Sequence, residues 1–306
     1  MHKIYNFFIS NLLVGLYFLN LRKRRNKNLE LEIIIFSFNR PLQLESLIQS
    51  LNSNLDGNVK INILYKTEIQ TNNSYEILKK SFIKNRNISF VCQGKSFKKS
   101  LIKLTKNLSY KNYSRKEILF FVDDQILFRK TKLDSIKKLF EMAPITTLRI
   151  GINTKRSFNL NKKQSIKDYT YSIKKDLLTW QPLFKKDDIS YVFSFDSSTI
   201  PLKLFSKFSR YLIYKGPNTL ESAMNYGGFT FKVLRLKISS FINQCAINFV
   251  ITKVQNETNN RGNFIDIKEL NKLFKNNWKL KIDKNEVEKF NSPHTDIGYL
   301  FEKKEI

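Results

Sequence analysis

The chain has 306 residues, enough to bury a large core in one elaborate domain or two small ones. Hydrophobic residues make up 42% of it and aromatic residues 13%, which excludes disorder over most of its length. The formal charge of +28 suits nucleic acid, anionic membranes or phosphorylated substrates. The basic residues are spread along the whole chain without a nucleic-acid-binding motif, which disfavours nucleic acid as a partner.

The first segment, residues 4–21, is mostly apolar and is followed directly by the basic residues 22–25. Its length is near the minimum for crossing a bilayer. Asn6, Ser10 and Asn11 fall at helical spacing and form a narrow polar stripe, so an interfacial helix anchored on anionic lipid is an equal alternative. The third alternative for this segment is a helix packed in the core of the protein. We expect a membrane-associated or hydrophobic helix within residues 1–28, with the body of the protein in the cytoplasm at the inner face of the membrane.

From residue 31 the pattern alternates between short apolar runs and segments with an apolar face at helical spacing. Such repeated units with short links predict an α/β fold in which a mostly parallel central sheet has helices on both faces. Strands are expected at 31–38, 59–65, 88–92 and 118–122, and helices from 41 to 51, 74 to 83 and 96 to 108.

The second half is less regular. A helix is expected at 132–142, a strand at 145–150, a polar loop over the site at 153–175, and a strand at 191–195. A further helix is expected to open at Pro217, with Asn218 as its cap and Glu221 in the capping-box position. The two cysteines, Cys92 and Cys245, lie in apolar segments, which predicts buried thiols in a reducing compartment. We divide the chain into residues 1–28 and one domain, 29–306, with a nucleotide-binding half to about 130 and an acceptor half from about 131.

Two adjacent carboxylates, Asp123 and Asp124, follow the apolar strand at 118–122. Open α/β sheets place ligand sites at the carboxyl ends of their strands. Neighbouring like charges in an apolar setting need compensation, and Mg²⁺ or Mn²⁺ would supply it. The alternative is an acidic turn in which Asp124 caps the next helix.

With these residues in view, the chain resembles nucleotide-sugar glycosyltransferases of the GT-A type, close to the large family-2 group. I-I-I-F-S-F-N-R-P is similar to that group's first strand and turn, and F-F-V-D-D-Q resembles its D-x-D element. The resemblance implies that Ser37, Asn39 and Arg40 face the nucleotide, that Asp123 touches the ribose and that Asp124 holds the metal. Gln125 stands where the third acid of D-x-D is expected, and a Q-x-x-R-W segment is absent from the sequence.

Four later residues complete the predicted site. Glu221 is the predicted catalytic base, or it merely caps its helix. Asp196 would hold sugar hydroxyls, or it is a turn residue at a strand end. His294 resembles the late histidine that serves such enzymes as a further metal ligand, or it is an exposed tail residue without a role. Arg149 could pair with the diphosphate through its forked donors, or it is a surface arginine at a strand end.

The predicted function is metal-dependent transfer of a sugar from a nucleoside-diphosphate donor to a glycan or lipid-linked acceptor, in synthesis of a bacterial surface polysaccharide and with inversion. One alternative is a nucleotidyltransferase on a related sheet, although the turn after the first strand lacks the expected glycines. A non-enzymatic basic protein that binds nucleic acid or membrane is the other.

Overall fold

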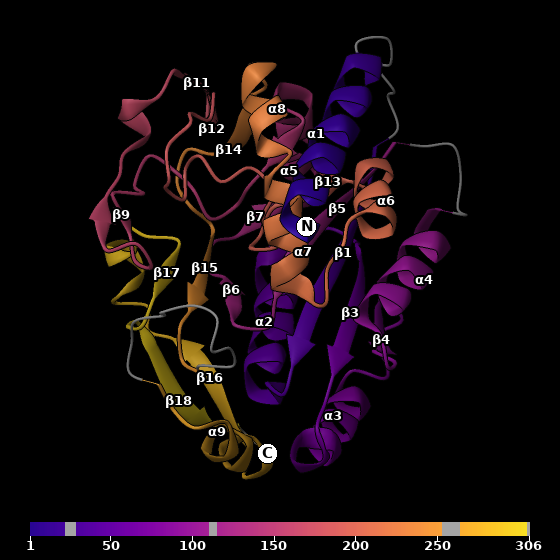
Figure 1. Cartoon of the computed structure of the whole chain (residues 1–306). Coiled ribbons are helices and arrows are strands. Elements are labelled where there is room, and N and C mark those ends of the chain that lie inside the picture. Colours follow the sequence, from indigo (N-terminus) through magenta and orange to yellow (C-terminus); the bar gives the residue numbers. More distant parts are fainter. Residues whose placement is uncertain (22–28, 110–114, 253–263, 305–306) are drawn as a thin grey trace.

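A five-stranded sheet forms the centre of the computed structural model, which describes residues 1–21, 29–109, 115–252 and 264–304 (Figure 1). The strand order is β13-β5-β1-β3-β4, and every neighbouring pair is parallel except β13 with β5. The predicted mostly parallel sheet is therefore confirmed. The strands are β1 (Leu29–Phe38), β3 (Lys60–Lys66), β4 (Ile88–Cys92), β5 (Arg115–Val122) and β13 (Thr199–Pro201).

Helices cover both faces of this sheet because its central strands are apolar on both sides. On β1, Ile33 and Ile35 belong to one buried cluster, whereas Ile34 and Phe36 belong to the other. The first cluster includes α2 (Pro41–Asn54), α3 (Ile69–Ser81), α5 (Leu133–Met142) and α9 (Ile267–Lys275). The second includes α1 (His2–Leu21), α4 (Phe97–Ser109), α6 (Leu202–Tyr211), α7 (Pro217–Asn225) and α8 (Gly228–Val233).

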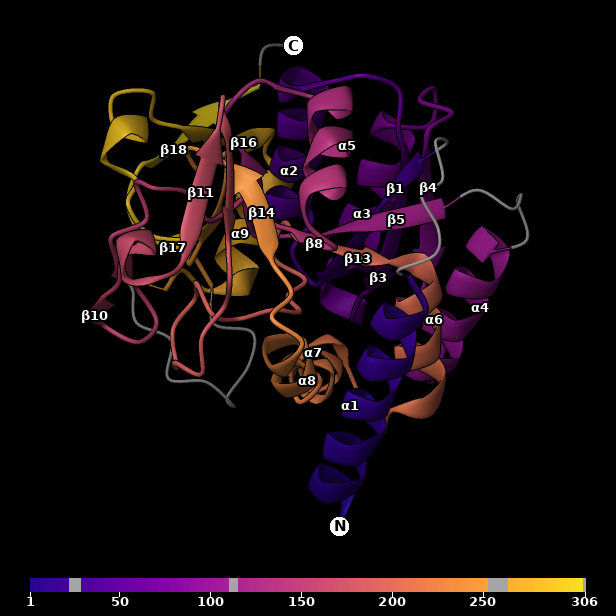
Figure 2. The ribbon, with the colours of Figure 1, turned by 90° about the horizontal axis from the view of Figure 1, so that it is seen from above.

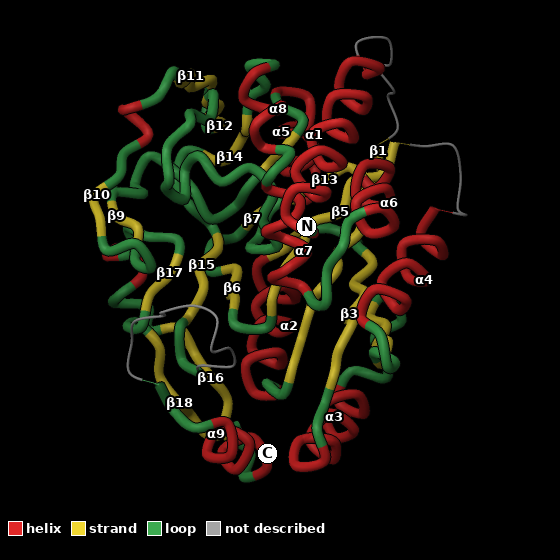
Figure 3. The backbone as a smooth tube through the Cα atoms, in the orientation of Figure 1, coloured by secondary structure: helices red, strands yellow, loops and turns green. Residues whose placement is uncertain are grey.

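The second half adds smaller sheets beside the central one, and Figure 3 shows that long loops connect them. The predicted division near residue 130 falls between β6 (Gln125–Leu127) and β7 (Thr131–Lys132). One sheet joins β6, β15 (Ala246–Phe249) and β17 (His294–Thr295), and another joins β8 (Ile145–Thr146), β11 (Tyr171–Lys174), β12 (Leu177–Trp180) and β14 (Ile238–Phe241). The remaining pairs are β2 (Leu55–Asp56) with β7, β9 (Arg156–Ser157) with β10 (Lys162–Lys163), and β16 (Trp278–Ile282) with β18 (Tyr299–Lys303).

The strand predicted at 191–195 is wrong, because this segment is irregular in the structure. Its apolar side chains are buried as a strand's would be, but side chains of α7 bind its backbone. Asn225 accepts a hydrogen bond from the N–H of Phe193, and Glu221 accepts one from the N–H of Phe195. The strand predicted at 145–150 is reduced to the two residues of β8. Cys245 is buried as predicted, but Cys92 is exposed.

Helix α1 is present where an apolar helix was predicted, and it lies on the outside of the domain against α6, α7 and α8 (Figure 2). Its polar stripe contacts the protein: Asn6 and Ser10 are buried, and Asn11 is partly buried. Within the described residues, no helix combines the length and the hydropathy needed to cross a bilayer.

Candidate functional site

The site lies where two neighbouring strands end. After β1 the chain runs outward through β3 and β4, and it then returns to place β5 on the other side of β1. Phe36 pairs with Val122 at the ends of these strands, and the N–H of Asp123 donates to the carbonyl of Phe36. Ligands bind at such a reversal of strand order in open α/β sheets. Arg40 follows one strand and Asp124 follows the other, so the topology brings them together.

Arg40 connects the two aspartates. Its Nη1 lies 3.0 Å from Oδ1 of Asp123 and 2.8 Å from Oδ2 of Asp124, while Nη2 donates to the carbonyl of Thr252 at 3.1 Å. Burial opposes the charged guanidinium, but the two carboxylates outweigh it and raise the pKa of Arg40. The protein itself therefore supplies a cation between the adjacent acids.

The residues at the end of β1 and in the turn that follows have two different roles. Ser37 donates to Oδ2 of Asp123 at 2.9 Å, and the N–H of Phe38 donates to the same oxygen at 2.9 Å. Asn39 has a left-handed backbone (φ 58°), and its Oδ1 accepts hydrogen bonds from the N–H of Glu68 and the hydroxyl of Thr71. Its side chain thus fixes the turn, and Asn39 does not line the pocket.

Asp124 is the less neutralised of the two acids. Burial, followed by repulsion from Asp123 and Asp196, raises its pKa to about 6 even though Arg40 and His294 favour the charged form. Its Oδ1 has only a long contact, 3.4 Å from Nδ2 of Asn248. Asp124 could therefore accept a further positive charge.

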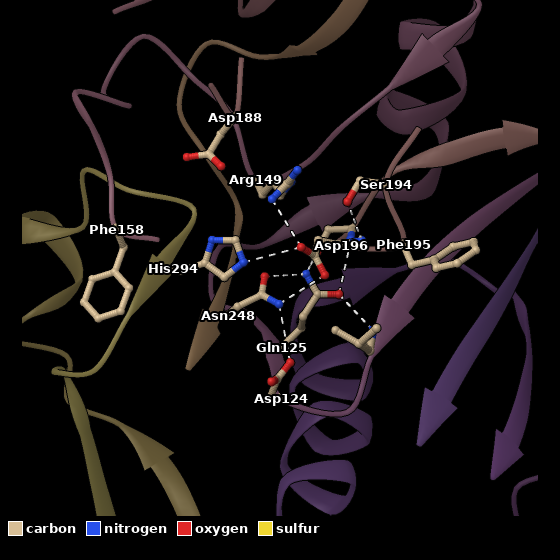
Figure 4. A network of polar contacts seen from close by, with 12 residues as sticks. Asp124, Gln125, Arg149, Phe158, Asp188, Ser194, Phe195, Asp196, Asn248 and His294 are labelled. Atoms are coloured by element: carbon tan, nitrogen blue, oxygen red, sulfur yellow. Dashed lines mark hydrogen bonds and ion pairs between the residues drawn. The ribbon is translucent and has the colours of Figure 1, made fainter. Parts of the chain in front are cut away.

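Asp196 is held by donors on three sides (Figure 4). Nδ2 of Asn248 lies 3.2 Å from its Oδ1, while Nη1 of Arg149 and Nε2 of His294 lie 3.2 and 3.4 Å from its Oδ2. Burial would raise the pKa of Asp196, but the hydrogen bond from His294 and the charge of Arg149 lower it to about 2. Asp196 is therefore ionised at neutral pH. Arg149 is buried behind it and does not line the pocket.

Strand β17 pairs with β15, and this pairing places His294 beside Asn248, within reach of the site. Nε2 faces Asp196, whereas Nδ1 is buried without a hydrogen-bond partner. In Figure 4 the Nδ1 edge of the ring points away from Asp124. In the described ranges, no group of three His, Cys, Asp or Glu residues is arranged to hold a metal ion.

Glu221 projects from the second turn of α7 and does not cap the helix. Thr219 instead accepts hydrogen bonds from the backbone N–H groups of Lys215 and Gly216 at the helix start. Oε2 of Glu221 accepts the N–H of Phe195 at 2.7 Å. Burial and the nearby charge of Asp196 raise the pKa of Glu221 to about 7, although a hydrogen bond from Tyr191 opposes this.

All the predicted site residues except Asn39 and Arg149 line one pocket of about 500 Å³. Sequence reasoning missed the exposed Lys66 and Lys215 at its wall, which no motif distinguishes from the other lysines of a basic chain. It also missed Asn248, which contacts Asp124 and Asp196 together. The volume lies in the range of small-molecule sites.

Gln125 explains the departure from D-x-D. Its Oε1 accepts the N–H groups of Val122 and Ser197, and its Nε2 donates to Oγ of Ser197 and Oδ1 of Asn248. Ser197 has a left-handed backbone (φ 47°), which costs energy for a residue other than glycine. A neutral amide at position 125 therefore braces the backbone beside Asp196, because a carboxylate could not donate two of these bonds.

No protein-family model and no curated protein matches this chain. Among solved structures it is similar to S. aureus TarS 1–349 in complex with UDP, with 15% identity, a TM-score of 0.45, and coverage of 71% of this chain and 59% of that one. It is also similar to the WbbM bifunctional glycosyltransferase (12% identity, TM-score 0.37, 67% of this chain and 38% of that one). A third similar structure is the 4-diphosphocytidyl-2C-methyl-D-erythritol synthase of Anaerococcus prevotii DSM 20548 (13% identity, TM-score 0.40, 80% and 96%). The chain thus spans less than two thirds of the TarS fragment, and these similarities are too distant to assign an activity.

Proposed function

We propose that this protein transfers a sugar from a nucleoside diphosphate to an acceptor hydroxyl. One observation carries the proposal: Glu221, a carboxyl with a pKa of about 7, shares a pocket with the strand-end cluster of Arg40, Asp123 and Asp124. A general base works best with a pKa near the operating pH. Sugar transfer requires a group that accepts the proton of the hydroxyl and, beside it, a place for the donor diphosphate, which the carboxylates could provide by holding a divalent cation.

Glu221 is the proposed base. As the acceptor oxygen bonds to the anomeric carbon, the bond from that carbon to the diphosphate oxygen breaks, and the acceptor proton passes to Glu221. This is an inverting transfer. Asp196, with a pKa of about 2, is too weak a base for this step. We propose instead that it positions donor or acceptor hydroxyls and keeps the pKa of Glu221 high by repulsion.

The donor would lie over the ends of β1 and β5. The exposed amines of Lys66 and Lys215 line the pocket and provide positive charge that favours a diphosphate, whereas the charge of Arg40 is balanced by Asp123 and Asp124. Asp123, fixed by Ser37 and Phe38, is the proposed partner of the ribose. The nucleoside and the sugar are left open in this proposal.

A divalent cation stays a prediction, with Asp124 and His294 as its proposed ligands. The pKa of Asp124, about 6, fits a carboxylate that lacks positive charge. His294 would have to contribute Nε2, which now contacts Asp196, because its Nδ1 points away from Asp124. Mg²⁺ is usually held by one or two protein groups plus substrate phosphates, so a three-residue site is not required. When bound, such an ion would neutralise the departing diphosphate.

Calorimetry with nucleoside diphosphates, with and without Mn²⁺, tests the donor site. In the presence of Mn²⁺, we expect Asp124→Asn to weaken binding about tenfold or more, equivalent to roughly 1.4 kcal/mol. Glu221→Gln should keep the binding and lose sugar transfer to a glycan or lipid-linked acceptor. The control is Asp134→Asn, which changes an exposed acid at the start of α5. The proposal is excluded if no nucleoside diphosphate binds, or if Asp124→Asn binds as well as the unchanged protein.

A further inference from the structure

Helix α1 uses its polar residues to complete the ends of three other helices. Nδ2 of Asn6 donates to the carbonyl of Ile213 at 2.8 Å, and its Oδ1 accepts the N–H of Ile213 at 2.9 Å. Ser10 donates to the carbonyl of Met224 and accepts from the N–H of Gly227. Asn11 accepts the N–H and the hydroxyl of Thr230. Helix ends leave such backbone groups unsatisfied, so these contacts fix which side of α1 faces the protein.

The opposite side of α1 is therefore apolar and faces outward. Exposed large side chains recur every three or four residues, each between 47% and 66% exposed. This spacing places them on one stripe of the helix. The stripe extends for about 22 Å at 1.5 Å per residue. Its members are Ile4, Phe8, Leu12, Leu16 and Leu19.

The apolar surface continues from α1 onto neighbouring elements. The ring of Phe7 lies 6.1 Å from that of Phe229 on α8, and Phe229 lies 5.6 Å from Phe184. Phe184, Phe229 and Val233 are each at least half exposed. We call these three residues together with the α1 stripe the outer apolar face. A contiguous face of this kind on a protein surface marks an interaction site.

The charges around the outer apolar face are almost all positive. The described segments that carry most of this face, residues 1–21 and 202–240, contain eight lysines and arginines and one acid, the pocket residue Glu221. Nζ of Lys232 lies 5.6 Å from the Phe184 ring. Two acids follow Phe184: Asp187 accepts hydrogen bonds from the hydroxyl of Tyr169 and the N–H of Ser190, and Asp188 accepts one from Gln164.

We propose that the outer apolar face docks on an anionic lipid bilayer, with α1 lying in the plane of the surface. Apolar side chains would enter the boundary between headgroups and acyl chains, while the surrounding lysines and arginines would contact the lipid phosphates. The uniform positive sign of the charge favours anionic lipid over a second copy of this chain, which would carry the same charge. This inference does not depend on the proposed chemistry.

The docking face and the pocket share α7. The first residues of α7 line the pocket, whereas Met224 at its other end contacts Ser10 of α1. Docking would therefore hold the pocket at a fixed height above the membrane. An acceptor attached to a lipid would reach the protein from that side.

Vesicle co-sedimentation of the full chain tests the proposal. We expect binding to vesicles containing phosphatidylglycerol and much weaker binding to pure phosphatidylcholine. The double variant Phe8→Glu with Leu12→Glu should reduce binding to the anionic vesicles about tenfold or more. The matched control, Ile69→Glu with Ile83→Glu, alters two exposed isoleucines at α3, on the other side of the sheet, and should bind as the unchanged protein does.

The variant Phe8→Trp gives a second measurement, because the fluorescence of the introduced indole should shift to the blue when the outer apolar face enters lipid. The proposal is overturned if the unchanged protein ignores anionic vesicles, if the two glutamates leave binding intact, or if the emission of the Phe8→Trp variant does not respond to them. Light scattering tests whether a second copy of the chain binds this face instead. If the unchanged protein dimerises without binding lipid, and Phe8→Glu with Leu12→Glu abolishes the dimer, this face binds a second copy. Circular dichroism of each variant checks that the fold is kept.

Discussion

Arg40 and Asp124 lie 84 positions apart in the chain and form a partly buried ion pair, with Nη1 2.8 Å from Oδ2. Asp123 shares the same Nη1 at 3.0 Å. The adjacent carboxylates after β5 repel each other, and Arg40, after β1, offsets part of this repulsion without any bound ion. The ordinary strand connection of an α/β fold thus builds the first charge pair of the site.

Replacing Arg40 by methionine should destabilise the protein in a pH-dependent way. The change leaves the buried Asp123 and the partly buried Asp124 without their cation, and breaking a buried pair in this way typically costs about 3–5 kcal/mol. The pKa of Asp124, already raised to about 6, would rise further, so the loss grows as pH increases and shrinks where Asp124 is protonated. Urea unfolding at pH 5 and pH 8 should show the larger loss at pH 8. Arg156→Met, an exposed arginine bonded to Asn161, is the control, and an equal loss at both pH values would contradict this account.

Glu221→Gln should make the protein more resistant to unfolding at high pH. Folding raises the pKa of Glu221 from 4.5 to about 7, so its ionisation opposes folding progressively between these values. Above pH 7 the cost is on the order of 3 kcal/mol. We expect the glutamine variant to gain stability relative to the unchanged protein between pH 5 and pH 8. Denaturant titrations at several pH values measure this, and a pH-independent difference would show that Glu221 is ionised in the folded protein throughout.

Asp196→Asn should shift the titration of Glu221 rather than abolish it. The charge of Asp196 is the second largest cause, after burial, of the raised pKa of Glu221. Removing it lowers that pKa, so the acidic limb of the pH profile for sugar transfer should move to lower pH. Asp176→Asn changes an exposed acid outside the pocket and should leave the profile in place.

Asp196→Asn should also lower the stability of the folded protein, whereas Glu221→Gln should raise it. Folding lowers the pKa of Asp196 from 3.8 to about 2, so its charge stabilises the folded state above pH 4 and loses that effect as pH falls through 2. Asp196→Asn should therefore cost stability at pH 7, on the order of 2 kcal/mol. An asparagine variant that is as stable as the unchanged protein at pH 7 would mean that Arg149 and His294 do not favour the charged carboxylate.

The first half of the fold was predictable because each strand and helix there follows a local rule. Apolar runs, Pro41 at a helix start and alternating periods each indicate one structure, and the structure agrees from β1 to β5. The end of the apolar strand at 118–122 indicated a ligand site at Asp123 and Asp124, and the family resemblance added Arg40. The strand order, in which β1 and β5 are neighbours, brings these residues together.

Contacts distant in sequence were not predictable. Residues 191–195 have the composition of a strand, but Glu221 and Asn225 satisfy their backbone in place of a neighbouring strand. Asn39 belongs to a motif that suggested the nucleotide, yet its amide fixes the turn by binding Glu68 and Thr71. The spacing of the polar residues on α1 does not show whether this stripe faces solvent or the protein. It faces the protein because its side chains bind backbone groups at the ends of α6, α7 and α8.

The packing of α1 against α7 and α8 depends on Gly227, which lies between these two helices. A Cβ added there would lie 2.6 Å from Cγ2 of Val14 and 2.7 Å from Oγ of Ser10, closer than such atoms approach. Gly227→Ala should therefore push α1 away, and overpacking of this kind typically costs about 1–3 kcal/mol. Gly15→Ala in the same packing interface is the matched control, since its added Cβ would meet only Thr230 at 3.6 Å. Alanine also favours a helix over glycine by up to about 1 kcal/mol. Thermal unfolding should thus place Gly227→Ala below the unchanged protein and Gly15→Ala at or above it. If both variants melt together with the unchanged protein, α1 does not pack on Gly227 in solution.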